Sequence, residues 1–252
     1  CYYFQLFICQ LFLVINSHHI SNRLSVYYES ICPDSRRFFL NQLMPAYEKL
    51  GQYLDVDLIP FGNANVSYPN YDRKPSFRCQ HGPDECYGNK AQACVLDITK
   101  MSGTGISGQP STTLQYIACM FSAGNWRQTQ VTAKQCAETV HLNWTQLSEC
   151  IDGSHGDRLM VAHSHRTFNL EPQHTFIPWI IIDGQQSNDI QERTQINLVQ
   201  YLCDNYHSKH EPKLAECSEK TLQSIQSQLS SAMNLKLSII SIIIATIMAL
   251  IL

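Results

Sequence analysis

The sequence feature that most constrains the fold is the junction at Cys32. An apolar, β-prone run ends at Tyr28, Cys32 follows, and a helical pattern begins at about Ser35. Apolar side chains recur in that helical stretch at three- and four-residue spacing, which makes one stripe that can pack on a sheet. Pro45 lies inside the stretch and should kink it. The chain therefore predicts a strand and a helix that meet at a cysteine.

The order of the predicted elements gives the fold class. We expect strands at 24–29, 56–60 and 176–183, a helix at 35–54, a cysteine-rich irregular segment at 63–94, a largely helical region at 112–150, a turn at 183–184 and a last helix at 192–206. This order predicts an α/β core with an inserted helical subdomain. With 252 residues and 44% apolar side chains, the chain is long enough to bury one full core.

Cysteine content and glycosylation motifs indicate the compartment in which the protein works, and its charge bears on the class of partner. Eleven cysteines are more than a reduced cytosolic protein usually carries, and Asn65 and Asn143 each begin an N-x-[ST] sequon. Both features point to the secretory pathway. The net charge of −3 and the lack of a basic run give no electrostatic support for nucleic-acid binding.

Both ends of the chain are apolar and lie outside the body of the protein, which we place at 24–217. Residues 1–20 resemble a truncated signal peptide, and the alternative is a buried first strand. A polar stretch at 218–234 is typical of a stalk. Residues 235–252 indicate a membrane anchor or a lipid-anchor signal, with a buried terminal helix as the alternative. The sequence therefore predicts membrane attachment through this C-terminal tail.

Cys32 is the candidate nucleophile. At the start of a helix it meets unpaired backbone N–H groups that stabilise an anion, and thiolate is the reactive form of cysteine. Without Cys1 and Cys9 of the signal segment, nine cysteines remain, and an odd number in a secreted body predicts one unpaired thiol. If Cys32 is that thiol, the others can form four disulfides; the alternative is that Cys32 is paired. The disulfide candidates are Cys79, Cys86, Cys94, Cys119, Cys136, Cys150, Cys203 and Cys217.

Ser35 and Pro178 complete the predicted catalytic set. Ser35 stands where a C-x-x-C site would carry its second cysteine. Its hydroxyl can donate a hydrogen bond to the Cys32 sulfur, but it cannot attack a mixed disulfide. Pro178 precedes an apolar strand, and many thiol-exchange folds place a cis-proline beside the reactive sulfur. The alternative is an ordinary trans proline at the start of a strand.

The segment CQHGPDECYGNKAQAC, from Cys79 to Cys94, carries the most specific pattern. It resembles the signature C-Q-H-G-x2-E-C-x2-N-x4-C of the gamma-interferon-inducible lysosomal thiol reductase family at all eight fixed positions. The likeness continues in YYESICPDS around Cys32 and in PFGNA, HRTFNLEPQHTFIPW and LCDNYHSKHEPKLAEC. It covers about residues 24–217.

The resemblance implies a thioredoxin-like fold with a helical, disulfide-rich insertion. It also implies an enzyme that reduces protein disulfides in lysosomes, endosomes or the extracellular space. Cys32 matches the attacking cysteine of the family, Ser35 falls at the position of the resolving cysteine, and the signature cysteines would be structural disulfide partners. No cofactor or metal is implied, and an external small thiol such as cysteine or glutathione would release the mixed disulfide.

Two other interpretations are open. Cys79, His81, Cys86 and Cys94 could form a zinc site, although an oxidising compartment favours disulfides over thiolate ligands. Because Ser35 cannot resolve a mixed disulfide, the competing function is a non-catalytic, membrane-attached binding module on the same scaffold. A trap that holds its clients as long-lived mixed disulfides is a third function.

Overall fold

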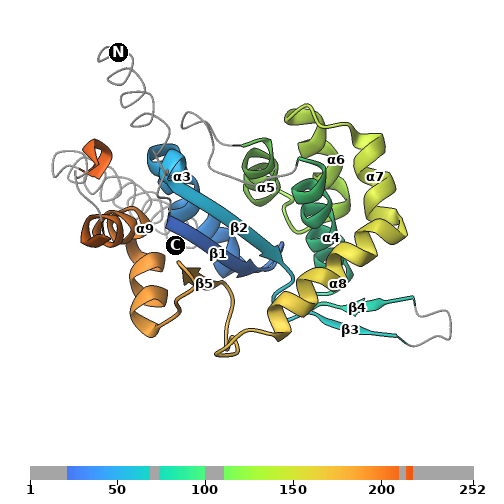
Figure 1. Ribbon diagram of the computed structural model, residues 1–252. Helices are drawn as coiled ribbons and strands as arrows, with labels where there is room; N and C mark the ends of the chain where they lie inside the picture. The colour runs from blue at the N-terminus through green and yellow to red at the C-terminus, as the bar shows by residue number, and fades with distance from the viewer. Residues whose placement is uncertain (1–21, 69–73, 100–110, 210–213, 218–252) are drawn as a thin grey trace, which may run out of the picture. The chain divides into compact units, whose positions relative to one another are not determined.

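The computed structural model describes residues 22–68, 74–99, 111–209 and 214–217 (Figure 1). The expected signal segment, stalk and C-terminal anchor lie outside these residues. The chain divides into two compact units, residues 1–199 and residues 200–252. Among the described residues, no helix has both the length and the apolar character needed to cross a membrane.

The fold is mixed α/β, with a three-stranded sheet, a separate two-stranded sheet and a set of helices. The strands are β1 (Asn22–Tyr28), β2 (Leu54–Pro60), β3 (Asn65–Ser67), β4 (Ser76–Arg78) and β5 (Trp179–Ile182). The helices are α2 (Pro33–Phe38), α3 (Met44–Leu50), α4 (Pro83–Ile98), α5 (Thr112–Ser122), α6 (Thr129–Thr139), α7 (Trp144–Asp152), α8 (Ser154–Phe168) and α9 (Asn188–Lys209).

Strand β1 lies at the centre of the larger sheet. It pairs in parallel with β2, where Tyr28 faces Pro60, and antiparallel with β5, where Tyr27 faces Trp179. The carboxyl ends of β1 and β2 and the beginning of β5 therefore lie at one edge of the sheet, which we call the carboxyl edge. Cys32 follows β1 at this edge. The topology thus places the candidate nucleophile near the segments that leave β2 and enter β5.

The helix after Cys32 starts earlier and ends earlier than the sequence predicted. It runs through α2, a π-helical turn at Phe39–Leu43 and α3, and a 3-10 turn at Gly51–Tyr53 leads into β2. Pro45 lies in the first turn of α3, just after the wider π turn, where its missing N–H removes one helical hydrogen bond. Leu54, predicted as the end of the helix, begins β2, and its side chain is buried there.

The segment between β2 and β5 forms the insertion. The sequence predicted an irregular segment at 63–94, but the structure has the β3–β4 hairpin and most of α4 there, so this prediction was wrong. The predicted helical region also ended at 150, whereas α8 follows it. Both missed helices bury small or polar side chains, such as Gly88 on α4 and Gly156 on α8. Hydrophobic periodicity therefore did not reveal them.

Three buried aromatic rings join the insertion to the sheet. Tyr28 of β1, Phe39 of the π-helical turn and Phe121 of α5 have ring centroids 6.3, 6.2 and 5.3 Å apart. Aromatic pairs at these distances add stability beyond the area they bury. Arg36, on the helix that follows Cys32, also donates from Nε to the carbonyl of Phe121 at 2.6 Å. The insertion is thus fixed to the helix that begins at Cys32.

Helix α9 closes the core and is interrupted at Asn197, whose φ of −153° and ψ of 87° are not helical. The side chain of Gln42 bridges the interruption. Its Oε1 accepts the N–H of Leu198 at 3.1 Å, and its Nε2 donates to the carbonyl of Ile196 at 3.1 Å. A side-chain amide thereby binds two backbone groups beside the break.

This arrangement is a thioredoxin-like α/β fold with a helical, disulfide-rich insertion. A parallel strand, helix, strand unit is followed, after the insertion, by an antiparallel strand and a closing helix. Strand β5 is shorter than the strand predicted at 176–183, and α9 begins before its predicted start at 192. These differences move the ends of elements and leave their order unchanged.

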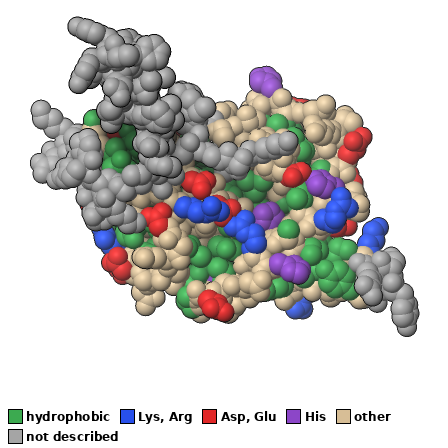
Figure 2. Space-filling model, in the orientation of Figure 1, with side chains coloured by type: hydrophobic (Ala, Val, Ile, Leu, Met, Phe, Trp, Pro, Cys, Tyr) green, Lys and Arg blue, Asp and Glu red, His purple; other side chains and the backbone are tan. Residues whose placement is uncertain are grey.

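The surface carries mixed charge on the face shown in Figure 2. Lys and Arg side chains lie among Asp, Glu and apolar side chains there, and no continuous basic surface is visible on that face. The sequon residues Asn65 and Asn143 are both exposed. Each is therefore accessible for glycosylation.

Candidate active site

Cys32 occupies the N-cap of α2. Its φ of −74° and ψ of 126° are extended, and its carbonyl accepts the N–H of Arg36 at 3.0 Å. Pro33 follows as the first helical residue, where proline is favoured because its ring presets the helical φ. Cys32 as a residue is 8% exposed, and it is the free cysteine among the described residues. The local sequence thus puts a single thiol at the start of a helix.

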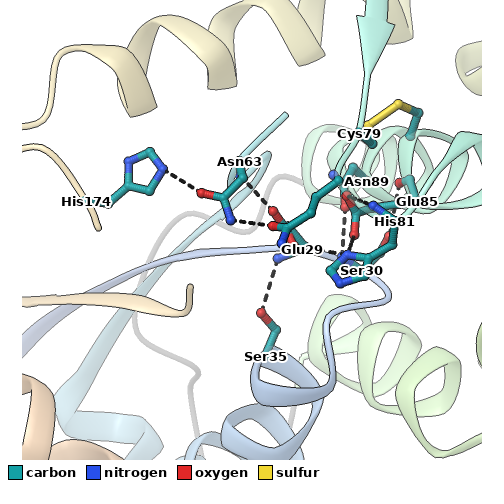
Figure 3. A network of polar contacts seen from close by, with 11 residues as sticks. Glu29, Ser30, Ser35, Asn63, Cys79, His81, Glu85, Asn89 and His174 are labelled. Carbon is teal, nitrogen blue, oxygen red and sulfur yellow. Dashed lines mark hydrogen bonds and ion pairs between the residues drawn. A yellow bond between two sulfur atoms is a disulfide. The ribbon is translucent and has the colours of Figure 1, made fainter. Parts of the chain in front are cut away.

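Ser35 lies in the first turn of the same helix. N-cap and N3 residues face each other across that turn, as capping-box pairs do. Ser35 is buried, and its Oγ accepts the backbone N–H of Glu29 at 3.3 Å (Figure 3). The hydroxyl therefore ties the start of α2 to the loop that follows β1.

Pro178 directly precedes β5 at the carboxyl edge. The Ile177–Pro178 peptide bond is cis, and Pro178 is buried. Its carbonyl accepts a hydrogen bond from Nε2 of Gln191 at 3.4 Å, and Oε1 of Gln191 accepts the N–H of Ile180 at 2.6 Å. Helix α9 thus holds the proline segment in place. Pro178 and Cys32 lie at the same edge of the sheet.

The eight cysteines other than Cys32 in the described residues form four disulfides. The pairs are Cys79–Cys86, Cys94–Cys150, Cys119–Cys136 and Cys203–Cys217. The first three lie within the insertion. Because Cys79, Cys86 and Cys94 are all oxidised, they have no thiolate to give to a metal. The zinc site left open for these three cysteines and His81 is therefore not formed.

A buried carboxylate network supports the loop between β1 and α2. Glu29 is fully buried; its Oε1 accepts the backbone N–H of Asn63 at 2.7 Å, and its Oε2 lies 3.4 Å from Nδ1 of His81. The same Nδ1 contacts Oε2 of Glu85, and the backbone N–H of His81 donates to Oε1 of Glu85 at 3.3 Å. Figure 3 shows Glu29 between Asn63 and His81. Three separate chain segments thus meet at Glu29.

A second set of contacts holds Ser30, the next residue of the loop. Its backbone N–H donates to Oδ1 of Asn89 at 2.8 Å, and its Oγ donates to the carbonyl of Glu85 at 3.1 Å. A Cβ added at Gly88 would lie 2.4 Å from Oγ of Ser30. Helix α4 therefore packs against the loop so closely that a side chain at position 88 would displace Ser30.

Asn63 extends the network toward the surface. Its Nδ2 donates to Oε1 of Gln80 at 2.6 Å, and its Oδ1 lies 3.1 Å from Nε2 of His174. Burial lowers the pKa of His174, which favours the neutral imidazole. Asn63 thus links the loop after β2 to the segment that precedes β5.

The pKa of Glu29 is higher than that of an ordinary glutamate. Burial first, and then the neighbouring carboxylate of Glu85, raises the pKa of Glu29 to about 7. The hydrogen bond from Asn63 and the nearby His81 act in the opposite direction but do not outweigh these effects. Glu29 therefore takes up a proton near neutral pH.

Comparison with known proteins shows the family. The family profile described as "Gamma interferon inducible lysosomal thiol reductase (GILT)" matches residues 23–140. GILT-like protein 1 of Drosophila melanogaster is 30% identical over 220 residues, which cover 84% of this chain and 87% of the relative. The chain belongs to the GILT family. The gamma-interferon-inducible lysosomal thiol reductase of Carassius auratus is 32% identical over 200 residues, which cover 78% of this chain and 72% of the relative.

Among solved structures, the chain is similar to a candidate protein disulfide isomerase from Nitrosomonas europaea. The two are 12% identical, and the match covers 75% of this chain and 99% of the other with a TM-score of 0.46.

The GILT signature has a structural explanation at this site. Its polar side chains Gln80, His81 and Asn89 contact the loops that follow β1 and β2. Sequence reasoning identified the signature but missed Glu29, because a glutamate at the end of a strand looks like an ordinary polar residue. Its position three residues before Cys32 was the available signal. The signature residues therefore hold the loop that leads to Cys32, the candidate nucleophile.

Replacement of Gly62, which packs against Glu29, should destabilise the fold. The φ of Gly62 is +57°, and a Cβ there would lie 2.3 Å from Cγ of Glu29. We expect Gly62→Ala to lower the free energy of unfolding by roughly 3 kcal/mol, through the left-handed backbone and the clash together. Urea unfolding measures the loss.

Gly184→Ala is the matched control for this prediction. Gly184 also has a positive φ, +76°, but nothing lies within 4 Å of its Cβ position. This variant should lose only about 1–2 kcal/mol, from the backbone alone. Equal losses in the two variants would mean that Glu29 moves aside without cost.

Proposed function

We propose that the protein is a thiol-disulfide oxidoreductase that reduces protein disulfides through the single sulfur of Cys32, with an external small thiol for release. The observation that carries the proposal is the position of Cys32. It is a free thiol at the start of a helix, at the sheet edge where Pro178 leads into β5. Membership of the GILT family supports the reaction class, since the relative from Carassius auratus is named a thiol reductase.

The first step forms a mixed disulfide. The thiolate of Cys32 attacks one sulfur of the substrate disulfide, and a bond forms between Cys32 and the substrate. The substrate S–S bond breaks, and the departing sulfur leaves as a thiolate that takes up a proton. One substrate sulfur is now reduced, and the other is held on the protein.

The second step needs a small thiol because Ser35 has no sulfur. The thiolate of that small thiol attacks the sulfur of Cys32 and frees the second substrate thiol. A second small thiol then restores Cys32 and leaves as a small-molecule disulfide. The cycle consumes two small thiols for each substrate disulfide and uses no bound cofactor.

Ser35→Cys should allow release without an added thiol. A cysteine at this position would face Cys32 across the first helical turn and could attack the mixed disulfide. The measurement is a single turnover of pre-reduced protein with a disulfide-containing peptide and no small thiol. The variant should free both substrate thiols, whereas the wild type should stop at a mixed disulfide that mass spectrometry finds on the Cys32 peptide.

Ser35→Ala is the matched control, because it removes the same hydroxyl without adding a sulfur. It should stop at the mixed disulfide as the wild type does. If Ser35→Cys also stops there, or if Ser35→Ala releases its substrate unaided, the external-thiol mechanism is wrong.

A non-catalytic binding module is the competing function. Two observations favour it: Cys32 is only 8% exposed, and Ser35 removes internal release. The single-turnover experiment separates the two functions, since a binding module forms no mixed disulfide at Cys32. A trap would form the mixed disulfide and keep it after a small thiol is added.

The disulfides and sequons support a place of action in the secretory pathway, in lysosomes or endosomes or outside the cell. Disulfides persist in oxidising compartments, and the described residues hold four. The substrates proposed are proteins with accessible disulfides, and the reductants are small thiols. Membrane attachment through residues 235–252 is a proposal from the sequence, because these residues lie outside those described.

A further inference from the structure

Glu29, His81 and Glu85 form a cluster that the proposed exchange reaction does not use. Each carboxylate commits one oxygen to a backbone N–H group: Oε1 of Glu29 to Asn63 at 2.7 Å, and Oε1 of Glu85 to His81 at 3.3 Å. The other oxygen of each carboxylate, Oε2, turns toward Nδ1 of His81. These three ligand atoms lie within 4.8 Å of one another.

A second observation is that one carboxylate oxygen of Glu29 is buried without a hydrogen-bond donor. Its side chain is fully buried, and its Oε2 makes no hydrogen bond; Nδ1 of His81 lies 3.4 Å away. A buried carboxylate oxygen without a donor is costly. Glu85 adds a second buried carboxylate beside the same imidazole, and two enclosed negative charges repel each other. A divalent cation between the carboxylates would remove both costs.

We propose that Glu29, His81 and Glu85 bind one zinc ion through Nδ1 of the imidazole and one Oε2 of each glutamate, with a fourth position for water. Imidazole selects zinc over calcium or magnesium, and three protein ligands with one open position is a common zinc geometry. The hydrogen bonds to the two Oε1 atoms would orient the ligands.

The distances suit this ion with a small adjustment. Ligand atoms of a tetrahedral zinc site lie about 3.3 Å apart, close to the 3.4 Å between Nδ1 of His81 and Oε2 of Glu29. The contact between His81 and Glu85 is a hydrogen bond, and it would open as zinc replaces its proton. The side chain of His81 is 25% exposed, which gives the ion a path from solvent.

A zinc ion here would hold the loop that leads to Cys32, because Glu29 is part of that loop. The sulfur of Cys32 would not be a ligand. The ion would join the end of β1 to the start of α4. This inference goes beyond the proposed function and does not depend on it, because metal binding is measured without any exchange reaction.

The test uses the full chain without an affinity tag, with its free thiols alkylated so that no thiolate can bind metal. After metal is removed with a chelator, zinc is titrated by calorimetry. Cobalt(II) is bound as a spectroscopic probe that zinc displaces. We expect one zinc per chain and the cobalt absorption of a four-coordinate nitrogen and oxygen site with no sulfur band.

Variants locate the ion. Glu29→Gln and His81→Asn should each weaken zinc binding by at least about tenfold. The control His155→Asn removes an exposed imidazole that lies 2.7 Å from Asp97, and it should leave the affinity unchanged. No zinc uptake by the wild type, undiminished affinity in both site variants, or a loss in the control would overturn the proposal.

A measurement on the wild type alone covers the case in which a site variant fails to fold. X-ray absorption of the bound zinc should show one imidazole and otherwise only oxygen ligands. A sulfur ligand, or a zinc ion without imidazole, would overturn the assignment.

Discussion

Cys32→Ala should lower the protein-dependent rate of disulfide reduction by at least about a hundredfold, so that essentially only the reaction of the small thiol itself remains. The proposed reaction passes through a covalent bond to this sulfur, and Cys32 is the free cysteine among the described residues. The measurement is the initial rate of reduction of a disulfide peptide with a quenched fluorophore at a fixed concentration of small thiol. The rate without protein is subtracted.

The control for this variant is the double substitution Cys203→Ala and Cys217→Ala. It also removes cysteines, but from a disulfide in the unit formed by residues 200–252. The control should retain most of the activity, and Cys32→Ala should keep a cooperative unfolding transition. Retained activity in Cys32→Ala would move the chemistry to another sulfur. Equal losses in both variants would indicate general damage to the fold.

Removal of the Cys94–Cys150 disulfide should cause the largest loss of stability among the four disulfides. Its cysteines are 56 residues apart in sequence. A cross-link restricts the unfolded chain more when the loop is longer, so this bond should contribute roughly 4 kcal/mol. It also joins α4, which contacts Ser30, to α7. The double substitution Cys94→Ala and Cys150→Ala should therefore lower the free energy of unfolding by about that amount.

The Cys119–Cys136 disulfide provides the matched comparison. It joins two neighbouring helices of the insertion, α5 and α6, with a sequence separation of 17. Its removal should cost roughly 3 kcal/mol by the same relation. Urea unfolding without reductant measures both variants. A reversed order would contradict the loop-length explanation and assign the difference to packing in the folded state.

The sequence alone predicted the three strands of the larger sheet and their order along the chain. Each strand of the larger sheet overlaps its predicted range, because buried strands are short apolar runs bounded by turn residues. The odd number of cysteines in the body predicted one unpaired thiol, and in the structure Cys32 is unpaired. The pairing of the other cysteines could not be predicted, since parity sets a number of bonds but not their connectivity.

Helices α4 and α8 of the insertion were harder to predict because their buried faces mix small and polar side chains with apolar ones. Helix α8 buries Gly156 and Ser164, and α4 buries Asn89. A pattern based on hydrophobicity does not see such a face. Pro83, directly after Gly82, was a usable signal for the start of α4, since proline favours the first helical position.

The Glu29 cluster lay beyond sequence reasoning for a different reason. It forms only when the loop after β1, the loop after β2 and the start of α4 come together. Asn63 and His81 are separated from Glu29 in sequence, and no local pattern connects them. Only the register of β1 against β2, which places the two loops at one edge, makes the contact predictable.

The distribution of the disulfides along the chain has a consequence for biosynthesis. Three of them join cysteines that are all made after β2 and before β5. As the chain emerges from a ribosome, these cysteines can reach their native partners before β5 exists. Strand β1 can pair with β2 early, whereas its pairing with β5 must wait for a much later segment. A nascent chain that stalls before Trp179 would thus carry an oxidised insertion, while Cys32 would lie at a carboxyl edge that still lacks β5.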